Sequence, residues 1–564
     1  MPTIDINLRE FEKLLGTAYA GKMERLDEDL AFVKGEVKLY NSQEDNVSIE
    51  IKDTNRPDLW SVEGLARALS GYLNPATKPK EYVVKESLVD VSVDSRLAAI
   101  RPFMGVAIIK NLNLDDTIIR GLMHLQDKLD QTYGRNREKT SIGLYDSSLI
   151  VPPLRYTVVK PDEISFTPLG FSEEMTLSQI LDRHPKGIEY GRIVKKHRVY
   201  PIILDSGNKV LSFPPIINSN DLGRVTAETR DVLVEVTGTV HEAVLNVLTL
   251  VTLALADRGG EVASAVLQYE GDGSRVVTPD FRDKLMELSV EYTNKILGLH
   301  LSGKQIAELL SIAGFRIEKT ASDKVGVLVP CNRVDVMHPV DLVEDVAIAY
   351  GYNRISPVWR DLPTTGSVKP EQHLLDKTRE LIVGLGFQEI MTNNLTNSET
   401  LFDKMDREKS KTIEVANPKV ATMTCLRNWL LPSLMEFLSS NKSVEFPQKI
   451  FELGKVTLAD EKKETRTRDE NWVAAVSSHA SASFTEIKSS LDSLLMNLGL
   501  TSRVEGIVHP SFIEGRVGEV VINEEKVGII GEIHPRVLER LKLENPVSAF
   551  EINFDKIILV KKSE

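Results

Sequence analysis

The chain has 564 residues, 42 % of them hydrophobic and 27 % charged, which is typical of a globular protein and long enough for about four domains. Its net charge of −13 argues against a protein that binds nucleic acid non-specifically on its own. Two cysteines and no Cys/His cluster exclude a zinc site. The N-terminus lacks an apolar signal-peptide core, and the most apolar segment, residues 243–256, is too short to span a bilayer; we therefore expect a cytoplasmic protein.

Residues 1–85 predict an N-terminal α+β domain. The pattern indicates a strand over Thr3–Asn7 and a helix over Val62–Leu73. Between them lies N-R-P-D-L at residues 55–59, where the restricted residue before proline favours a turn and Asp58 can cap the following helix. The residues alone favour a structural turn and cap over a functional role. Residues 74–80 are typical of a linker.

Residues 90–275 alternate between strands and helices, with strands predicted at 106–110, 199–204 and 232–236 and helices at 118–133 and 240–256. Ser212 begins a run in which paired prolines lead into a polar loop ending at Asn218. The strand 232–236 directs Glu235 and Thr237 to one face, because alternate residues of a strand share a side. These polar groups suit the rim of a small-molecule pocket, but the residues alone favour an ordinary sheet edge.

Two basic runs stand out against the acidic balance, Y-G-R-N-R-E-K at residues 133–139 and R-I-V-K-K-H-R at residues 192–198. Each can contact phosphates. A solvated charged surface is the favoured alternative for both.

Residues 276–360 contain two predicted helices, 293–299 and 302–313, a strand at 325–329, and then an acidic helix. Pro339 suits the first turn of that helix, and Gly351 suits the position just past its end.

Four carboxylates gather at the start of the acidic helix. Asp341, Glu344 and Asp345 stand at i, i+3 and i+4 and share one face, which Asp335 can reach from the preceding loop. Carboxylates this close repel one another unless a cation lies among them, and an all-oxygen set suits Mg²⁺ or Ca²⁺. The alternative is an acid-rich helix start stabilised by the helix dipole.

Two motifs carry a family resemblance. The run R-x-D followed by D-L-x-E-D-x-A-x-x-Y-G-Y, beginning at Arg333, resembles the metal-helix domain of phenylalanine–tRNA ligase β subunits. N-R-P-D-L followed by E-G-L-A-R-A-L resembles the opening domain of the same family. The similarity extends along essentially the whole chain, which is identified as a member of this family in its archaeal/eukaryotic form.

The resemblance implies a multidomain α/β and α+β fold with two sites. Residues 90–275 become a mixed tRNA-editing domain that hydrolyses Tyr-tRNA(Phe), with Ser212, Asn218, Glu235 and Thr237 in its pocket. There Glu235 would bind the tyrosine hydroxyl, and a positioned water would attack the ester, since no nucleophile motif is present. Residues 276–360 become a small metal-helix domain, whose one Mg²⁺ near the α subunit is held by four acidic residues: Asp335, Asp341, Glu344 and Asp345.

Residues 365–564 become an antiparallel class II synthetase-like core that is catalytically inactive. The segment 531–536 lacks the glycine repetition of a working class II motif, so no catalytic residue for aminoacylation is expected in this chain. The family implies an α₂β₂ heterotetramer whose α subunit binds ATP and phenylalanine and charges tRNA(Phe). A free-standing aminoacyl-tRNA hydrolase and a non-enzymatic scaffold subunit remain the alternatives.

Overall fold

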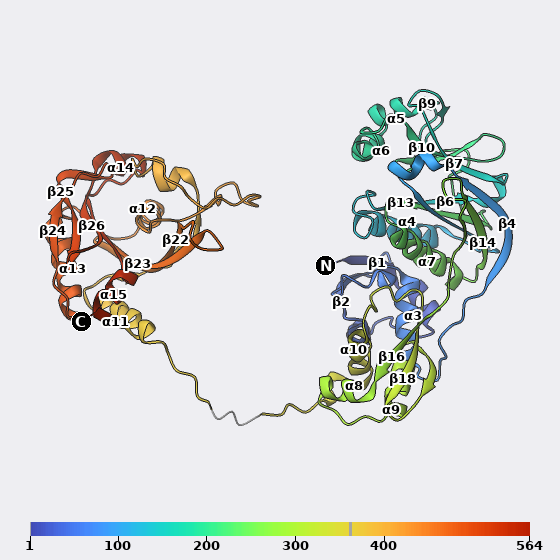
Figure 1. Ribbon diagram of the computed structural model, residues 1–564, viewed down its shortest axis with the longest axis horizontal. Coiled ribbons are helices and arrows are strands. Elements are labelled where there is room, and N and C mark those ends of the chain that lie inside the picture. Colours follow the sequence, from blue (N-terminus) through green and yellow to red (C-terminus); the bar gives the residue numbers. More distant parts are fainter. Residues whose placement is uncertain (1, 360–363, 564) are drawn as a thin grey trace. The chain divides into compact units, whose positions relative to one another are not determined.

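The computed structural model describes residues 2–359 and 364–563, and the chain forms two compact units, Met1–Val358 and Trp359–Glu564. Each unit combines helices with β-sheets (Figure 1). The prediction of a mixed α/β multidomain fold is therefore confirmed. No helix in the described part of the chain is both long enough and apolar enough to cross a membrane.

The first unit opens with a three-stranded antiparallel sheet of order β1-β3-β2 and its helices. Its elements are β1 (Thr3–Asn7), α1 (Leu8–Leu15), α2 (Met23–Leu30), β2 (Gly35–Asn41), β3 (Asn46–Ile51) and α3 (Val62–Leu73). The bounds of α3 match the prediction, but its cap does not: Ser61, not Asp58, accepts the first-turn N–H, from Gly64. Asp58 is instead bound to Arg56 through two hydrogen bonds of 2.8 Å.

A ten-stranded sheet forms the centre of the first unit. Its strands are β4 (Val84–Val93), β5 (Phe103–Lys110), β6 (Thr140–Asp146), β7 (Leu154–Val159), β10 (Tyr200–Leu204), β11 (Val210–Phe213), β12 (Ile217–Asn218), β13 (Val232–Gly238), β14 (Glu261–Tyr269) and β15 (Arg275–Thr278). They run in the order β12-β11-β10-β7-β4-β14-β5-β13-β6, and β15 pairs with β14. Because β13 lies between β5 and β6 and all seven of its residues are buried, it is not the sheet edge that the residues alone favoured.

Helices cover this sheet. The elements are α4 (Asp116–Gln131), α7 (His241–Asp257) and, beside the short pair β8 (Ser165–Phe166) and β9 (Met175–Thr176), α5 (Leu177–Arg183) and α6 (Pro185–Tyr190). The apolar segment predicted as a buried helix is α7, which packs on β5 and β13. A helix that is apolar on nearly all sides must be buried in this way. Figure 1 shows α4 and α7 side by side next to the sheet, with α5 and α6 above them.

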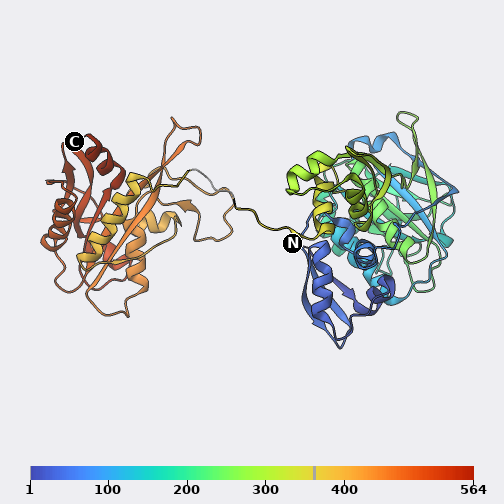
Figure 2. The ribbon, with the colours of Figure 1, turned by 90° about the horizontal axis from the view of Figure 1, so that it is seen from below.

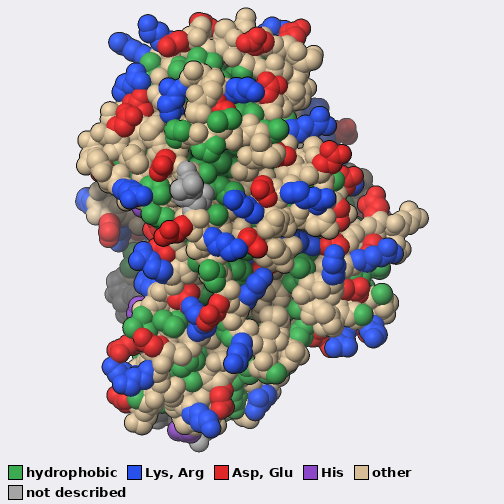
Figure 3. All heavy atoms as spheres, turned by 90° about the vertical axis from the view of Figure 1, so that its right-hand side faces the viewer, with side chains coloured by type: hydrophobic (Ala, Val, Ile, Leu, Met, Phe, Trp, Pro, Cys, Tyr) green, Lys and Arg blue, Asp and Glu red, His purple; other side chains and the backbone are tan. Residues whose placement is uncertain are grey.

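The last part of the first unit is a three-stranded antiparallel sheet, of order β16-β18-β17, with three helices. Its elements are β16 (Lys284–Ser289), α8 (Val290–Leu297), α9 (Gly303–Ile312), β17 (Arg316–Thr320), β18 (Lys324–Val329) and α10 (Pro339–Tyr350). The acidic helix α10 begins at Pro339, and Gly351 with φ 94° follows its end, as predicted. On the face of the unit drawn in Figure 3, basic and acidic side chains are interspersed.

Figure 2 shows the second unit from another direction, with helices packed on a sheet. The sheet has seven strands in the order β19-β22-β23-β27-β26-β25-β24, and among the described residues of this sheet only β19 and β22 pair in parallel. Its strands are β19 (Gln388–Glu389), β22 (Gln448–Ala459), β23 (Thr467–Ser478), β24 (Arg503–Gly506), β25 (Phe512–Ile522), β26 (Glu525–Ile533) and β27 (Val547–Asn553), and β20 (Leu395–Thr396) pairs with β21 (Cys425–Leu426) apart from them. The helices are α11 (Pro370–Gly384), α12 (Leu431–Ser440), α13 (Phe484–Asn497), α14 (Pro535–Arg540) and α15 (Phe554–Ser563). One apolar core joins the sheet to α11, α13 and α15, and a second joins it to α12 and α14.

Candidate functional site

A cavity of about 310 Å³ lies beside β13 in the first unit. Ser212, Asn218 and Glu235 all line it, although they come from three different strands, β11, β12 and β13. The register explains this convergence, because Ser212 is paired with Asn218 across β11 and β12. The structure thus brings together three of the four residues predicted to form a pocket.

Glu235 is a buried acid in the wall of the cavity. Its side chain is only 3 % exposed, and its Oε2 accepts a hydrogen bond of 2.9 Å from the Tyr145 hydroxyl. Burial raises the pKa of Glu235 to about 7, against the opposing effects of that hydrogen bond, of Arg101 and of the Thr237 hydroxyl. Its second oxygen, Oε1, has no hydrogen-bond partner among the described residues. A buried carboxyl with a free oxygen is poised to bind a polar group of a ligand.

Thr237, the fourth predicted residue, does not line the cavity but lies behind its wall. It points to the same side of β13 as Glu235, as the alternation predicted, and is fully buried. The buried guanidinium of Arg101 donates to the Thr237 hydroxyl at 3.0 Å, to its carbonyl at 2.7 Å and to the Ser141 hydroxyl at 3.0 Å. Ser141 lines the cavity, so Thr237 and Arg101 hold its wall in place.

Tyr145 was missed as a site residue by the sequence reasoning, although its hydroxyl contacts Glu235 and lies 3.4 Å from the Asn218 side chain. Gly143 makes room for this contact, because it faces Glu235 across β6 and β13. A Cβ added at Gly143 would lie 2.6 Å from the Glu235 carboxylate and would also overlap the Tyr145 hydroxyl. The only available signal was alternation along β6, which directs Ser141, Gly143 and Tyr145 to one side.

Three cations line the cavity from three separate segments: Arg137, Lys186 and Arg224. Arg137 is paired with Asp130 at 2.9 Å and Lys186 with Glu189 at 3.0 Å, whereas Glu235 is the only acidic residue among the described residues of the lining. Arg137 donates to the carbonyls of Pro215 and Ile216 at 3.2 and 3.0 Å, which ties the basic run 133–139 to the double-proline loop. This cavity can accept a polar, uncharged group beside Glu235 and a negatively charged group beside its basic side chains.

The four carboxylates of the acidic helix are not gathered around a common point. Arg333 lies between two of them: its guanidinium donates to both oxygens of Asp335, at 2.9 and 2.8 Å, and to both oxygens of Asp345, at 3.3 and 2.7 Å. All three side chains are at most 8 % exposed. The guanidinium of Arg333 therefore occupies the space between these two acids, and Arg56 supplies a second cation 3.6 Å from Asp335.

The other two carboxylates point elsewhere. Asp341 closes the N-terminus of α10 by accepting the N–H groups of Met337 and His338 at 2.8 and 2.7 Å. Glu344 is half exposed and forms an ion pair of 2.5 Å with Lys34. Within residues 2–359 and 364–563, no group of three or more His, Cys, Asp or Glu side chains is arranged to hold a metal ion.

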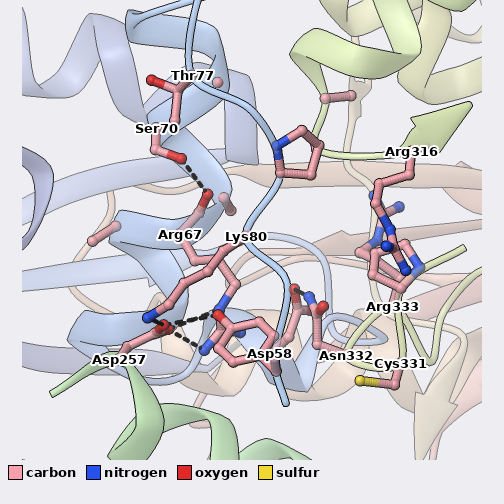
Figure 4. A pocket seen from close by; sticks show the side chains of 18 of the residues that line it. Asp58, Arg67, Ser70, Thr77, Lys80, Asp257, Arg316, Cys331, Asn332 and Arg333 are labelled. Carbon is pink, nitrogen blue, oxygen red and sulfur yellow. Dashed lines mark hydrogen bonds and ion pairs between the residues drawn. The ribbon is translucent and has the colours of Figure 1, made fainter. Parts of the chain in front are cut away.

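The two motifs that carried the family resemblance meet beside a cavity of about 390 Å³ (Figure 4). Asn332 donates to Asp58 at 3.3 Å, and Arg56 lies 3.6 Å from Asp335. In Figure 4, Asp58 and Asn332 lie together in the pocket wall, with Arg333 close by. The N-R-P-D-L element thus contacts the approach to the acidic helix through buried charges.

Models of known families match two parts of the chain. The tRNA synthetase B5 domain matches residues 286–352, and the phenylalanyl tRNA synthetase beta chain CLM domain matches residues 355–554. With the α/β architecture described above, these matches define a subunit of an aminoacyl-tRNA synthetase, a ligase of protein biosynthesis.

Full-length relatives give the family. Phenylalanine–tRNA ligase β subunits of Pyrococcus abyssi and Pyrococcus furiosus are each 43 % identical over 98 % of this chain and 99 % of theirs, and that of Thermofilum pendens is 38 % identical over 99 % and 98 %. The crystal structure of an N-terminal fragment of the Pyrococcus horikoshii phenylalanyl-tRNA synthetase β subunit covers 62 % of this chain and 100 % of that fragment, at 38 % identity and a TM-score of 0.60. The chain belongs to the phenylalanine–tRNA ligase β-subunit family, which confirms the resemblance drawn from its motifs.

Proposed function

We propose that the cavity beside β13 is an editing site that hydrolyses Tyr-tRNA(Phe), and that residues 90–275 form the editing domain. The observation that carries this proposal is the Glu235 carboxyl, buried in the cavity with one oxygen free. A tyrosine side chain would place its hydroxyl against that oxygen. Phenylalanine has no hydroxyl, so it would leave the buried Oε1 of Glu235 without a partner, and sites of this kind reject the analogue lacking the polar group.

The reaction is ester hydrolysis by water. Among the described residues that line the cavity there is no cysteine or histidine; the Ser141 hydroxyl bonds to Arg101 and Thr237, and the Ser212 hydroxyl has no hydrogen-bond partner among the described residues, so neither serine is bonded to an activating base. The tyrosyl group would enter with its hydroxyl at Glu235 and its ester toward the mouth. Arg137, Lys186 and Arg224 would then face the charged 3′ end of the tRNA, where cations offset phosphate charge.

Substitution of Glu235 tests this proposal in the complex with the α subunit. Glu235→Ala removes a hydrogen bond to a charged acceptor, which is worth roughly 1.5–3 kcal/mol, so hydrolysis of Tyr-tRNA(Phe) should fall about tenfold or more. Charging of tRNA(Phe) with phenylalanine should stay near normal. Equal loss of both activities would indicate misfolding, and undiminished hydrolysis would refute the role of Glu235.

We further propose that aminoacylation takes place on an α subunit within an α₂β₂ heterotetramer in the cytoplasm. Phenylalanine and ATP would bind to α, while the second unit, proposed to be an inactive class II synthetase-like core, would brace the interface. Its buried Arg427 supports inactivity, because it is bound internally to Glu452 at 2.8 Å and to the Lys455 carbonyl at 2.9 Å. Exposed apolar side chains, such as Met391 at 93 % and Val383 at 53 %, suit a surface covered by a partner.

Two alternatives make different predictions for the purified chain. A free-standing aminoacyl-tRNA hydrolase would hydrolyse Tyr-tRNA(Phe) at full rate without α, and a scaffold subunit would not affect hydrolysis with or without α. Separate assays of charging and hydrolysis, on the chain alone and with α, distinguish all three. Full charging activity from the chain alone would refute the assignment of catalysis to α.

Magnesium at the metal-helix domain, residues 276–360, requires a different arrangement from the one seen. Because Arg333 occupies both Asp335 and Asp345, the four residues do not fit an ion held by all of them together. We propose Mg²⁺ only for the α-bound state, in which Glu344 would exchange Lys34 for the metal. Glu344→Gln should then weaken assembly with α at limiting Mg²⁺ and leave the isolated chain unchanged; identical assembly of the two proteins would refute the site.

A further inference from the structure

The two basic runs, 59 residues apart at their starts in the sequence, lie side by side in the structure. Glu138 of the first run forms an ion pair with Arg192 of the second. The guanidinium of Arg137 also stacks on the ring of Tyr190, just before the second run, at 4.5 Å. The first run therefore lines the cavity through Arg137, and these two contacts join the start of the second run to it.

Most of the positive charge on this surface has no ion-pair partner among the described residues. We call the surface the basic rim and define it by six cations: Arg135, Lys139, Arg192, Lys195, Lys196 and Arg198. Arg192 is paired with Glu138 and Lys195 with Asp182, at exposed sites where such pairs are weak. The other four form no ion pair among the described residues, although Lys139 packs over the Tyr133 ring. A cluster of unpaired cations on an otherwise acidic chain indicates an anionic partner.

The backbone of the first run is held in a strained conformation. Arg135, Asn136 and Arg137 are three consecutive non-glycine residues with positive φ, of 50°, 52° and 66°. Their N–H groups are anchored to the end of α4, through the carbonyls of Thr132, Gln131 and Asp130. L-residues adopt this region at a cost and rarely in succession. The turn sends Arg137 into the cavity wall and leaves Arg135 exposed, and such strain is typical of functional segments.

We propose that the basic rim binds the phosphate backbone of the tRNA acceptor arm and positions its 3′ end in the cavity. The inference rests on the proposed editing function, since the rim borders the cavity of that site. A polyanion is a better candidate for this surface than an acidic peptide. Four of the cations are not held by a carboxylate in a fixed geometry, and contact with a phosphate backbone requires only positive charge. The rim residues touch no reacting atom and act by positioning the substrate.

A triple substitution tests the rim in the complex with the α subunit. Arg135→Gln, Lys196→Gln and Arg198→Gln together remove three unpaired, exposed charges. The matched control is Lys284→Gln, Lys295→Gln and Lys319→Gln, which removes three exposed, unpaired charges from the metal-helix domain. The readouts are KM and kcat for Tyr-tRNA(Phe) hydrolysis and the dependence of tRNA(Phe) binding on salt.

We expect KM to rise about tenfold in the rim variant, with kcat within twofold of the parent. The slope of log affinity against log salt should fall by about 2 to 3, since each lost phosphate contact removes about 0.7–0.9. The control variant should match the parent. If rim and control variants have the same KM and salt slope, the basic rim does not bind tRNA, even where the parent edits.

Failure of the editing proposal gives a different result. A parent complex that does not hydrolyse Tyr-tRNA(Phe) refutes editing, and binding of uncharged tRNA(Phe) with its salt slope then still decides the rim. A rim variant that binds tRNA normally but no longer copurifies with α would overturn the inference in favour of a protein-binding surface.

Discussion

Replacement of Arg333 by Met should destabilise the first unit severely. The guanidinium makes four hydrogen bonds, of 2.7 to 3.3 Å, to Asp335 and Asp345, and lies 4.8 Å from the centre of the Phe315 ring. Methionine fills much of the same volume but leaves buried Asp345 without its ion-pair partner and buried Asp335 with only Arg56, at 3.6 Å. Removal of one partner from a buried ion pair costs about 3–5 kcal/mol.

The loss of stability should lie near the lower end of that range. Burial already raises the pKa of Asp345, so the variant can relieve part of the cost by protonating this residue. For the first unit, Met1–Val358, an unfolding entropy of about 2.1 cal/mol/K per residue converts a loss of about 3–5 kcal/mol into a fall in Tm of roughly 4–7 °C. Thermal unfolding followed by circular dichroism measures this shift.

Two control variants make the result specific. Lys319→Met removes an exposed, unpaired charge and should leave Tm unchanged. Arg333→Lys keeps the charge but cannot bridge both carboxylates with a planar fork, so its Tm should be intermediate. If Arg333→Met loses less than about 1 kcal/mol, or no more than Lys319→Met, Arg333 is not the group that stabilises this cluster.

Three further predictions follow from single groups. Hydrolysis of Tyr-tRNA(Phe) should increase as pH rises through about 7, because the Glu235 carboxylate accepts the phenol hydrogen, and a Glu235→Gln pH–rate profile should lack that step. Burial raises the pKa of Glu551 to about 8, so the folded second unit holds a proton that the unfolded chain releases near its ordinary pKa. The contribution of Glu551 to the free energy of unfolding is fully present below about pH 4.5 and is lost as the pH rises toward 8. Denaturant titrations of Glu551→Gln should therefore show a weaker decline of the free energy of unfolding with pH. Gly64→Ala should cost about 1–3 kcal/mol because its Cβ would overlap the Asp58 carbonyl, whereas Gly121→Ala in α4, with open space around it, should gain about 0.5–1 kcal/mol, as urea unfolding would show.

Local sequence patterns predicted the ends of helices well where residues close to those ends determine them. The limits of α10 follow from Pro339 and Gly351, and those of α3 from a run of helical apolar positions. The cap of α3 was assigned to the wrong residue. Asp58 is close enough in sequence to cap α3. Its carboxylate instead accepts hydrogen bonds from Arg56 and from Asn332, which lies 274 residues away.

Contacts between residues far apart in the sequence also account for the difference between the two predicted sites. Alternation along β13 placed Glu235 and Thr237 on one side, and Ser212 and Asn218, which the family resemblance had assigned to the same pocket, line the cavity with Glu235. Spacing along a strand cannot identify Tyr145 or Arg101, because those contacts depend on which strands become neighbours. For the acidic helix, spacing showed four carboxylates, but the cations that neutralise three of them come from the loop before it and from Lys34, 310 residues away.

The contact between the N-R-P-D-L element and the approach to α10 constrains the order in which the chain can mature on the ribosome. Asp58 emerges long before Asn332 and Arg333, and at 5–20 residues per second the interval is about 15–55 s. Glu63 likewise precedes Arg258, with which it pairs at 2.6 Å. During that time, Asp58 can be paired with Arg56 but has no contact with Asn332. This edge of the first domain therefore reaches its final set of contacts only after the metal-helix segment has been made.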